Sequence, residues 1–325
     1  MRFINQCMKS ILIKIFSLLV ILSCFTGFSK LNATEKSFSK RFNLLATTTH
    51  LADLASQIAG KLINIDALMG PGIDPHSYRA TAQDIMRLQA ADFVLFHGLS
   101  LEGKIARVLQ ETKRKGITHY SPCEELPKKT LIFTDDTNKA VDPHVWFSPE
   151  IWITCADSFT QKLSEVLPEH RNEFEENLSK LKTSIKEIDR WGKSLIKALP
   201  ETNRILITSH DAFQYFGDHF EIRVIGLQGI NTMVEAGLAD RTNLSDFIEK
   251  HQSPALFVES SVNPKALEEI AKETGASIGG TLFSDALGTG NEFVKGPTGE
   301  NFSTATWQGM MVHNLIVIEH ALNKR

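Results

Sequence analysis

Two Asp-Pro-His segments stand out among the residues that could do chemistry. Asp74-Pro75-His76 follows a predicted strand, and Asp142-Pro143-His144 comes near the end of the same half of the chain. Proline fixes its own φ and restricts the residue before it, so each histidine follows a stiff stretch of backbone. Two imidazoles presented in this way are candidates for preorganised metal ligands.

The second half of the chain adds two side chains of the same kind. His210 comes directly after a predicted strand, and Asp285 lies near the last predicted strand. Ligands of open α/β sheets bind beyond the carboxyl ends of the strands. Three histidines and one aspartate could fill a tetrahedral site for zinc or another first-row ion. Spacing alone leaves open the alternative that each is an ordinary surface, loop or hydrogen-bonded residue.

The chain contains eleven histidines, and most are expected to be surface or hydrogen-bonded residues rather than metal ligands. His50 stands at a predicted helix start and is expected near the cleft. His97 ends a predicted strand and is expected to contact the ligands. Neither is predicted to be a ligand itself.

Strand and helix signals alternate along the chain, which predicts βαβ units and parallel sheets. In the first half, strands are predicted at 42–48, 63–69 and 93–97, with helices at 50–59, 81–90 and 101–115. In the second half, strands are predicted at 204–208, 223–227, 255–259 and 277–282, with helices at 212–220, 244–251, 264–274 and 304–323. The run 93–97 is wholly apolar, as expected for a strand that is covered on both faces.

One long amphipathic segment separates the two halves. Between Pro168 and Leu199, apolar residues recur mostly three or four positions apart, which predicts a helix of about 45 Å. We therefore expect an α/β protein with two parallel-sheet lobes joined by a single long helix, and a metal site in the cleft between them. The predicted divisions are a signal peptide at 1–33, lobes at 34–167 and 200–325, and the linking helix at 168–199.

The N-terminus has the pattern of a secretory signal peptide. Basic residues precede the apolar run 15–25, and no acidic residue occurs before Glu35. Cleavage after Ala33 is one expectation; a loose lipobox ending at Cys24 offers a lipid anchor instead. The alternatives are a buried helix or an uncleaved anchor. We expect export to the periplasm or the cell surface.

Charge and cysteine content narrow the function further. The chain has a net charge of −3, which becomes −7 without residues 1–33 because these carry four basic residues and no acidic one. An acidic protein of this kind is not expected to bind nucleic acid. Outside the predicted signal, Cys123 and Cys155 either form a disulfide or are buried free thiols.

Together these segments resemble the zinc and manganese solute-binding family of bacterial ABC importers, the TroA-like and ZnuA-like proteins. The resemblance runs from about residue 42 to the C-terminus and rests on six motifs, at 70–78, 142–146, 209–216, 227–230, 257–261 and 278–288. It implies a metal site made of His76, His144, His210 and Asp285, with Zn²⁺ as the expected ion and Mn²⁺ as the alternative. It also implies a non-enzymatic, monomeric protein that docks on a membrane permease driven by a cytoplasmic ATPase.

Two departures and several rival functions accompany the resemblance. The segment 128–141 is short and has no histidine, unlike the His-rich loop of ZnuA-like members, so the TroA-like group is favoured. His97 stands where relatives often have asparagine. The rivals are a zinc-dependent hydrolase, a binding protein for a chelated metal or another small ligand, and an adhesin of the same fold. The hydrolase is disfavoured because no HExxH signature occurs and four protein ligands leave little room for water.

Overall fold

The first lobe is built on a parallel sheet of four short strands. The computed structural model describes residues 41–134, 140–251 and 255–323. The strands are β1 (Asn43–Ala46), β2 (Asn64–Ala67), β3 (Phe93–Leu95) and β4 (Thr118–Tyr120), in the order β2-β1-β3-β4. Because all four run in the same direction, their carboxyl ends share one edge of the sheet.

Helices α2 (Thr49–Ala59), α3 (Ala82–Ala90) and α4 (Ala106–Arg114) connect these strands. Thr48 caps α2, and Thr81 and Asp84 form a reciprocal capping box at the start of α3. The helix predicted from 101 begins only at 106, after Leu99 and Ser100, which have positive φ. Residues 98–105 therefore form turns in place of the first helical turn.

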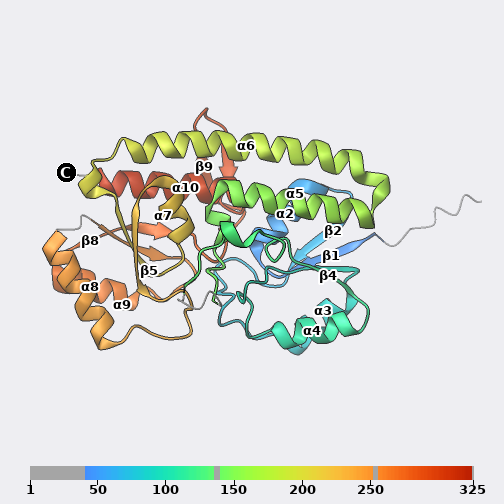
Figure 1. Ribbon diagram of the computed structural model, residues 1–325, viewed down its shortest axis with the longest axis horizontal. Coiled ribbons are helices and arrows are strands. Elements are labelled where there is room, and N and C mark those ends of the chain that lie inside the picture. The colour runs from blue at the N-terminus through green and yellow to red at the C-terminus, as the bar shows by residue number, and fades with distance from the viewer. Residues whose placement is uncertain (1–40, 135–139, 252–254, 324–325) are drawn as a thin grey trace, which may run out of the picture. The chain divides into compact units, whose positions relative to one another are not determined.

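The second lobe repeats the arrangement. Its sheet contains β5 (Ile205–His210), β6 (Arg223–Gln228), β7 (Ala255–Glu259) and β8 (Ser277–Leu282), all parallel and in the order β6-β5-β7-β8. Its helices are α7 (Gln214–Phe220), α8 (Leu238–His251), α9 (Lys265–Thr274) and α10 (Trp307–Leu322). A small antiparallel pair, β9 (Phe293–Lys295) and β10 (Asn301–Ser303), precedes α10. Figure 1 shows the two sheets with their helices.

One large helix, α5 (Pro149–Val166), was not predicted from the sequence. Its start carries an ordinary signal, because Ser148 caps it and Pro149 occupies the first turn. Strand β4 and the β9–β10 pair were also missed, since each strand has only three residues. Short strands of this kind depend on their neighbours more than on local propensity.

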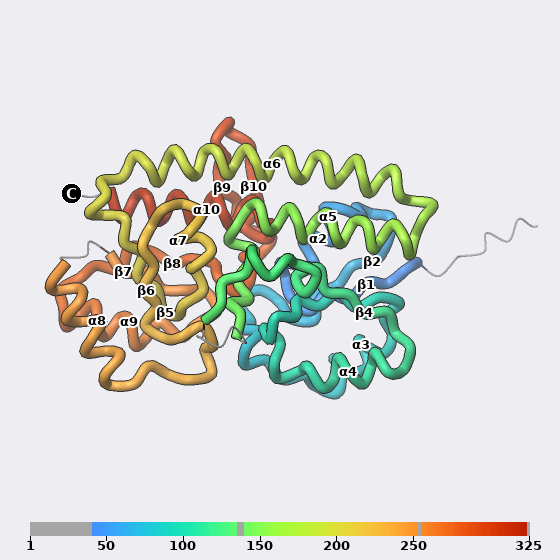
Figure 2. Tube along the Cα trace, viewed as in Figure 1, coloured from blue at the N-terminus to red at the C-terminus, as the bar shows by residue number. Residues whose placement is uncertain are grey.

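The long helix predicted between the lobes is α6 (Arg171–Lys197), preceded by a 3₁₀ turn at Pro168–His170. Its 27 residues extend over about 40 Å. It contacts α2 and α5 of the first lobe and α7 and α10 of the second, as Figure 2 makes visible. At Gly192 an added Cβ would lie 2.8 Å from Leu315 of α10, so glycine permits this close approach. The helix thus packs against both lobes and links them.

The apolar core is continuous from one lobe to the other. Phe147 stacks on Phe213 with ring centroids 4.4 Å apart, and both belong to one cluster that also includes residues of α6 and α10. The indole nitrogen of Trp307 donates to the carbonyl oxygen of Trp146 at 2.8 Å. Relative motion of the lobes would therefore disrupt packed side chains, which are costly to rearrange.

The predicted domain boundaries at 33/34, 167/168 and 199/200 stay a prediction. The predicted signal peptide and Cys24 lie outside the described residues. Within the described ranges, none of the helices combines the length and apolar character that crossing a membrane requires. Cys123 and Cys155 are buried free thiols with sulfur atoms 3.8 Å apart.

A first prediction concerns the close contact between the start of α10 and the backbone that precedes it. At Gly309 an added Cβ would lie 1.9 Å from the backbone oxygen of Ser303, so alanine there must displace backbone rather than a flexible side chain. We expect Gly309→Ala to lower the free energy of unfolding by about 3 kcal/mol. Gly290→Ala is the matched control, because no atom lies within 4 Å of the new Cβ. Equal denaturation midpoints for the two variants would contradict this packing.

Candidate metal centre

His76 is presented by the loop that follows β2. The loop turns through Gly70-Pro71-Gly72, with Gly72 at φ +73°. The carboxylate of Asp74 accepts a hydrogen bond from the His76 backbone amide at 2.8 Å and one from the Ser77 hydroxyl at 2.7 Å. Pro75 and His76 are both buried. The Asp-Pro-His segment therefore forms a locally closed turn that directs the imidazole inward.

His144 is the most firmly held of the candidate ligands. Asp142 Oδ1 accepts from the His144 backbone amide at 2.9 Å and lies 2.6 Å from Nδ1 of the ring. The ring nitrogen Nε2 of His97 lies 2.7 Å from the carbonyl oxygen of Pro143, and Tyr215 donates to the carbonyl of Asp142 at 3.0 Å. With Nδ1 bonded to a carboxylate, Nε2 faces the site and would carry the lone pair once the ring loses a proton.

His210 closes β5 and has a carboxylate partner of its own. Glu259, the last residue of β7, accepts from the His210 backbone amide at 2.8 Å and lies 2.6 Å from Nδ1. Strands β5 and β7 are neighbours in the sheet, which is why these two strand ends meet. Nε2 of His210 is thereby left free to face the site.

Asp285 follows β8 on a loop that other elements hold on both sides. The side-chain amide of Asn314, in α10, pairs with both the backbone N–H and the carbonyl of Phe283, at 3.0 and 2.8 Å. Beyond Asp285, the Leu287 amide donates to the hydroxyl of Thr49, at the start of α2. The loop is therefore held to helices of both lobes.

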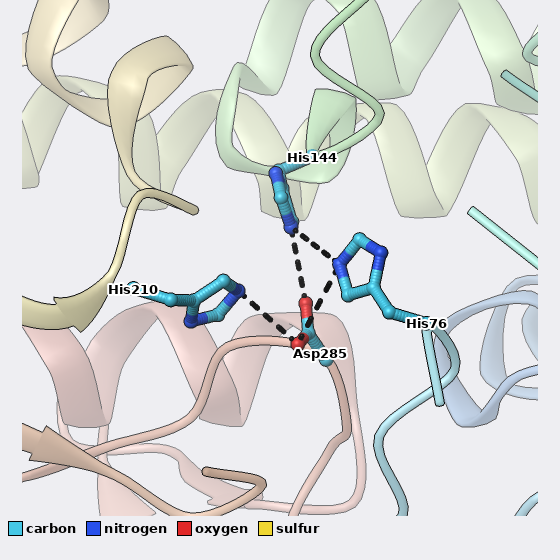
Figure 3. A group of neighbouring side chains, drawn as sticks. All are labelled: His76, His144, His210 and Asp285. Atoms are coloured by element: carbon cyan, nitrogen blue, oxygen red, sulfur yellow. Dashed lines mark hydrogen bonds and ion pairs between the residues drawn. The ribbon is translucent and has the colours of Figure 1, made fainter. Parts of the chain in front are cut away.

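The structure brings all four candidate residues together, two from each lobe (Figure 3). Asp285 lies 3.2 Å from Nε2 of His144 and 3.2 Å from Nε2 of His210. His76 Nε2 is 3.3 Å from His144 Nε2 and 4.0 Å from Asp285. The four ligating atoms all lie within 4.8 Å of one another. Three nitrogens and one oxygen at such spacing match the donor set of a tetrahedral zinc site.

The cluster is excluded from water. His144 and His210 are fully buried, Asp285 is 1% exposed and His76 is 4% exposed. Among the described residues, neither oxygen of Asp285 accepts a hydrogen bond of normal geometry, and neither does Nε2 of His210. Buried polar atoms without partners are rare in folded proteins and need a reason. A bound cation would supply one.

The pKa values of the ligating side chains are shifted by the charges around them. Burial disfavours the charged form of His144, but the carboxylates of Asp142 and Asp285 outweigh burial and raise the pKa of this imidazole to about 9. Glu259 and Asp285 raise the pKa of His210 against burial in the same way. The pKa of Asp285 is lowered, because His210 and His144 outweigh burial. Without an ion, the cluster is therefore held by imidazolium–carboxylate pairs.

His76 behaves differently from the other two histidines. Its pKa is lowered to about 4, chiefly by burial. It is thus neutral in the ion-free site and can donate a lone pair without first losing a proton.

Two histidines outside the cluster lie where they were expected. His97 contacts the Asp142–His144 segment through its bond to Pro143, so it touches the backbone beside a candidate ligand. His50 stacks on Trp146 with ring centroids 4.5 Å apart, and Trp146 in turn lies 5.3 Å from the His144 ring. Neither belongs to the group of four.

The two carboxylates behind the cluster were not predicted to have a role. Asp142 lies beside His144 in the sequence, and Glu259 ends a predicted strand. Ligating imidazoles usually donate their second N–H to a carboxylate or carbonyl. With that rule, an acidic residue at the end of a strand next to β5 becomes a candidate partner for His210.

Fold and cluster together define a two-lobed binding protein with a group of metal-ligating side chains between its lobes. The family model described as "ZnuA: Zinc-uptake complex component A periplasmic" matches residues 44–321. The chain belongs to this family.

Relatives and solved structures agree with this assignment. The manganese-binding lipoprotein MntA of Bacillus subtilis is 38% identical over 296 residues, which cover 90% of this chain and 93% of MntA. The zinc-binding protein TroA of Treponema pallidum is 32% identical and is covered to 98%. The solved structure of periplasmic TroA superimposes with a TM-score of 0.80 over 87% of this chain and 99% of that one.

The electrostatics of the cluster predict how metal affinity varies with pH. A metal ion must displace the protons that His144 and His210 hold when their pKa values are raised. We expect the Kd for zinc to increase by about ten- to hundredfold per unit as the pH falls from 8 to 6, for one to two displaced protons. Competition titrations at several pH values measure this, and calorimetry in buffers of different ionisation enthalpy counts the protons. A pH-independent Kd would contradict the assigned charges.

Proposed function

We propose that this protein is the solute-binding component of an ABC importer and that it captures one divalent transition metal ion between its lobes. The observation that carries the proposal is the cluster of His76, His144, His210 and Asp285, whose ligating atoms lie within 4.8 Å of one another and are shielded from water. Membership in the zinc-uptake family supports it, and so do relatives that are named as metal-binding proteins.

Zinc is the ion that the donor set favours. Imidazole nitrogens suit zinc, and the general affinity order for divalent ions places zinc well above manganese at such a site. The names of relatives do not choose between the two, because MntA is named for manganese and TroA for zinc. A site that binds zinc more tightly in vitro can still carry manganese where zinc is scarce.

Capture and delivery follow from the arrangement of the lobes. The long helix α6 and the continuous core restrict the lobes to small rearrangements. The loaded protein would present its enclosed ion to a membrane permease whose transport is driven by a cytoplasmic ATPase. Delivery would then require a local opening of the cleft rather than wide separation of the lobes.

Rival functions receive no support from the site. A catalytic zinc usually has three protein ligands and keeps one position open for water. Here four side chains surround one point, which suits binding rather than hydrolysis. The relatives named above are metal-binding proteins, which supports neither an enzyme nor an adhesin.

Export is part of the proposal. The basic and apolar N-terminal segment would direct the protein across the membrane, and either cleavage after Ala33 or lipidation of Cys24 would produce the mature form. MntA is named as a lipoprotein and the TroA structure as a periplasmic protein, which supports both routes.

Loss of single ligands tests the proposed function directly. Each alanine variant of the four residues should fold and should bind zinc more than about 100-fold more weakly, since even the partners of ligands cost 10- to 100-fold when removed. His320→Ala is the control, because this histidine is exposed and outside the cluster. Competition titrations give the affinities, and thermal unfolding of the ion-free proteins verifies folding. Wild-type affinity in any one variant would remove that residue from the site.

A second test concerns the choice of metal. The resemblance implies that manganese-selective relatives commonly have glutamate at the position of His210, and hard oxygen ligands suit manganese. We expect the wild-type protein to bind zinc more tightly than manganese. His210→Glu should reduce the difference between its affinities for the two ions.

Because Glu259 lies 2.6 Å from the His210 ring, the substitution would oppose two carboxylates. The double variant His210→Glu/Glu259→Gln removes this repulsion and should show the narrowing more clearly. Competition titration of both ions provides the measurement. Equal or tighter binding of manganese by wild type would overturn the zinc preference.

A further inference from the structure

The two sides of the cleft are joined in different ways. On the side of α6, the lobes share a packed core. Two hydrogen bonds also join them there. The Tyr215 hydroxyl donates to the carbonyl oxygen of Asp142 at 3.0 Å, and the Trp307 indole N–H donates to that of Trp146 at 2.8 Å. These bonds come from large side chains that are themselves buried. This side cannot open without disturbing the interior.

On the other side, the loop 70–78 covers the cluster and carries His76. It approaches the second lobe at Gly72, where an added Cβ would lie 3.7 Å from the Ser260 carbonyl oxygen. It is hydrogen-bonded to that lobe through the Thr232 hydroxyl, which donates to Oδ2 of Asp74 at 2.7 Å. Thr232 belongs to the loop 229–237, which follows β6. Loop 229–237 is largely exposed and loop 70–78 is exposed at 71–73 and at Ser77, so this side can move without opening the core.

Asp74 transmits this contact to the metal cluster. One of its oxygens accepts from the His76 backbone amide at 2.8 Å, while the other accepts from Thr232 and from Ser77, each at 2.7 Å. The second lobe is thereby linked through a single carboxylate to the backbone of a candidate ligand. His76 is also the most exposed of the four, at 4%. An ion that leaves the cluster would lose this ligand with the least disturbance.

We propose that Thr232 is a positioning residue for metal capture, whose hydroxyl holds the loop 70–78 against the second lobe and thereby keeps His76 on the ion. The proposal rests on the proposed function and specifies how the same site controls release. Formation of the bond closes the loop after the ion has entered. Its rupture frees the loop and His76 together, while His144, His210 and Asp285 stay in place.

Removing the hydroxyl should therefore act mainly on the rate of release. Thr232→Val keeps the shape of the side chain and removes the donor to a carboxylate. Hydrogen bonds to charged groups are among the stronger ones in proteins, so we expect zinc to leave about tenfold faster. Thr232→Ser keeps the hydroxyl and should restore slow release.

Two matched variants separate this role from a general loss of a hydroxyl. Ser77→Ala removes a hydrogen bond of the same 2.7 Å length to the same oxygen of Asp74, but one that stays within the first lobe. It should change the release rate much less than Thr232→Val does. Thr242→Val removes an exposed hydroxyl that bonds to the carbonyl of Leu238 in its own helix, and it should release zinc at the wild-type rate.

The experiment is stopped-flow mixing of the zinc-loaded full-length mature protein with an excess of a chromophoric chelator, for wild type and each variant. Thermal unfolding of the ion-free proteins verifies that each variant folds, and the rate of zinc release reports on the position of the loop. In an Asp74→Ala background, Thr232→Val should have no further effect, because both changes break the same link.

The outcomes are distinct. Faster release by Thr232→Val, recovery with serine and non-additivity with Asp74→Ala support the proposal. Wild-type release by Thr232→Val, or full additivity with Asp74→Ala, overturns it while leaving the proposed function intact. Failure of the wild-type protein to bind either zinc or manganese overturns the proposed function and the role of Thr232 with it.

Discussion

The arrangement of this protein around its metal cluster follows from one carboxylate, Asp285, that is buried among three imidazoles. Asp285 is almost fully enclosed, and both of its oxygens face ring nitrogens. An isolated charge in such a place is strongly disfavoured, so positive charge must accompany it. Protons on His144 and His210 meet this need in the absence of an ion. A divalent cation meets it with four ligands at once, which couples metal binding to proton release.

The carboxylates of Asp142 and Glu259 support the histidines of the cluster from behind. Each bonds the backbone amide and faces the Nδ1 atom of the histidine that it supports, so ring orientation and tautomer are set before any ion arrives. With Asp285 they place three buried carboxylates around three imidazoles, and a dication would offset two of these three negative charges. Preorganisation of this kind reduces the ordering that binding must impose.

The cluster lies between a tightly packed side, next to helix α6, and a loosely packed side, formed by the loop that carries His76. Helix α6 crosses both lobes, and Phe147 and Phe213 join their cores by direct stacking. By contrast, the loop that carries His76 is partly exposed, and it is hydrogen-bonded to the second lobe through the bond from Thr232 to Asp74. A packed interior resists deformation, whereas an exposed loop opens at low cost. The division explains how an enclosed ion could exchange without large lobe motion.

The alternation of strands and helices and the long helix could be predicted from the sequence, because periodicity is a local property of the chain. Spacing marked the ligands only as candidates, and their meeting at one site was predicted through the family resemblance, since they are up to 209 positions apart. The sequence could not reveal Glu259 behind His210 or Thr232 beside Asp74, because neither has a local pattern that indicates its partner. Helix α5 and strands β4, β9 and β10 were also missed. The pairings of distant residues depend on the tertiary structure, because parallel strands bring distant carboxyl ends to one edge and loops from two lobes then converge there.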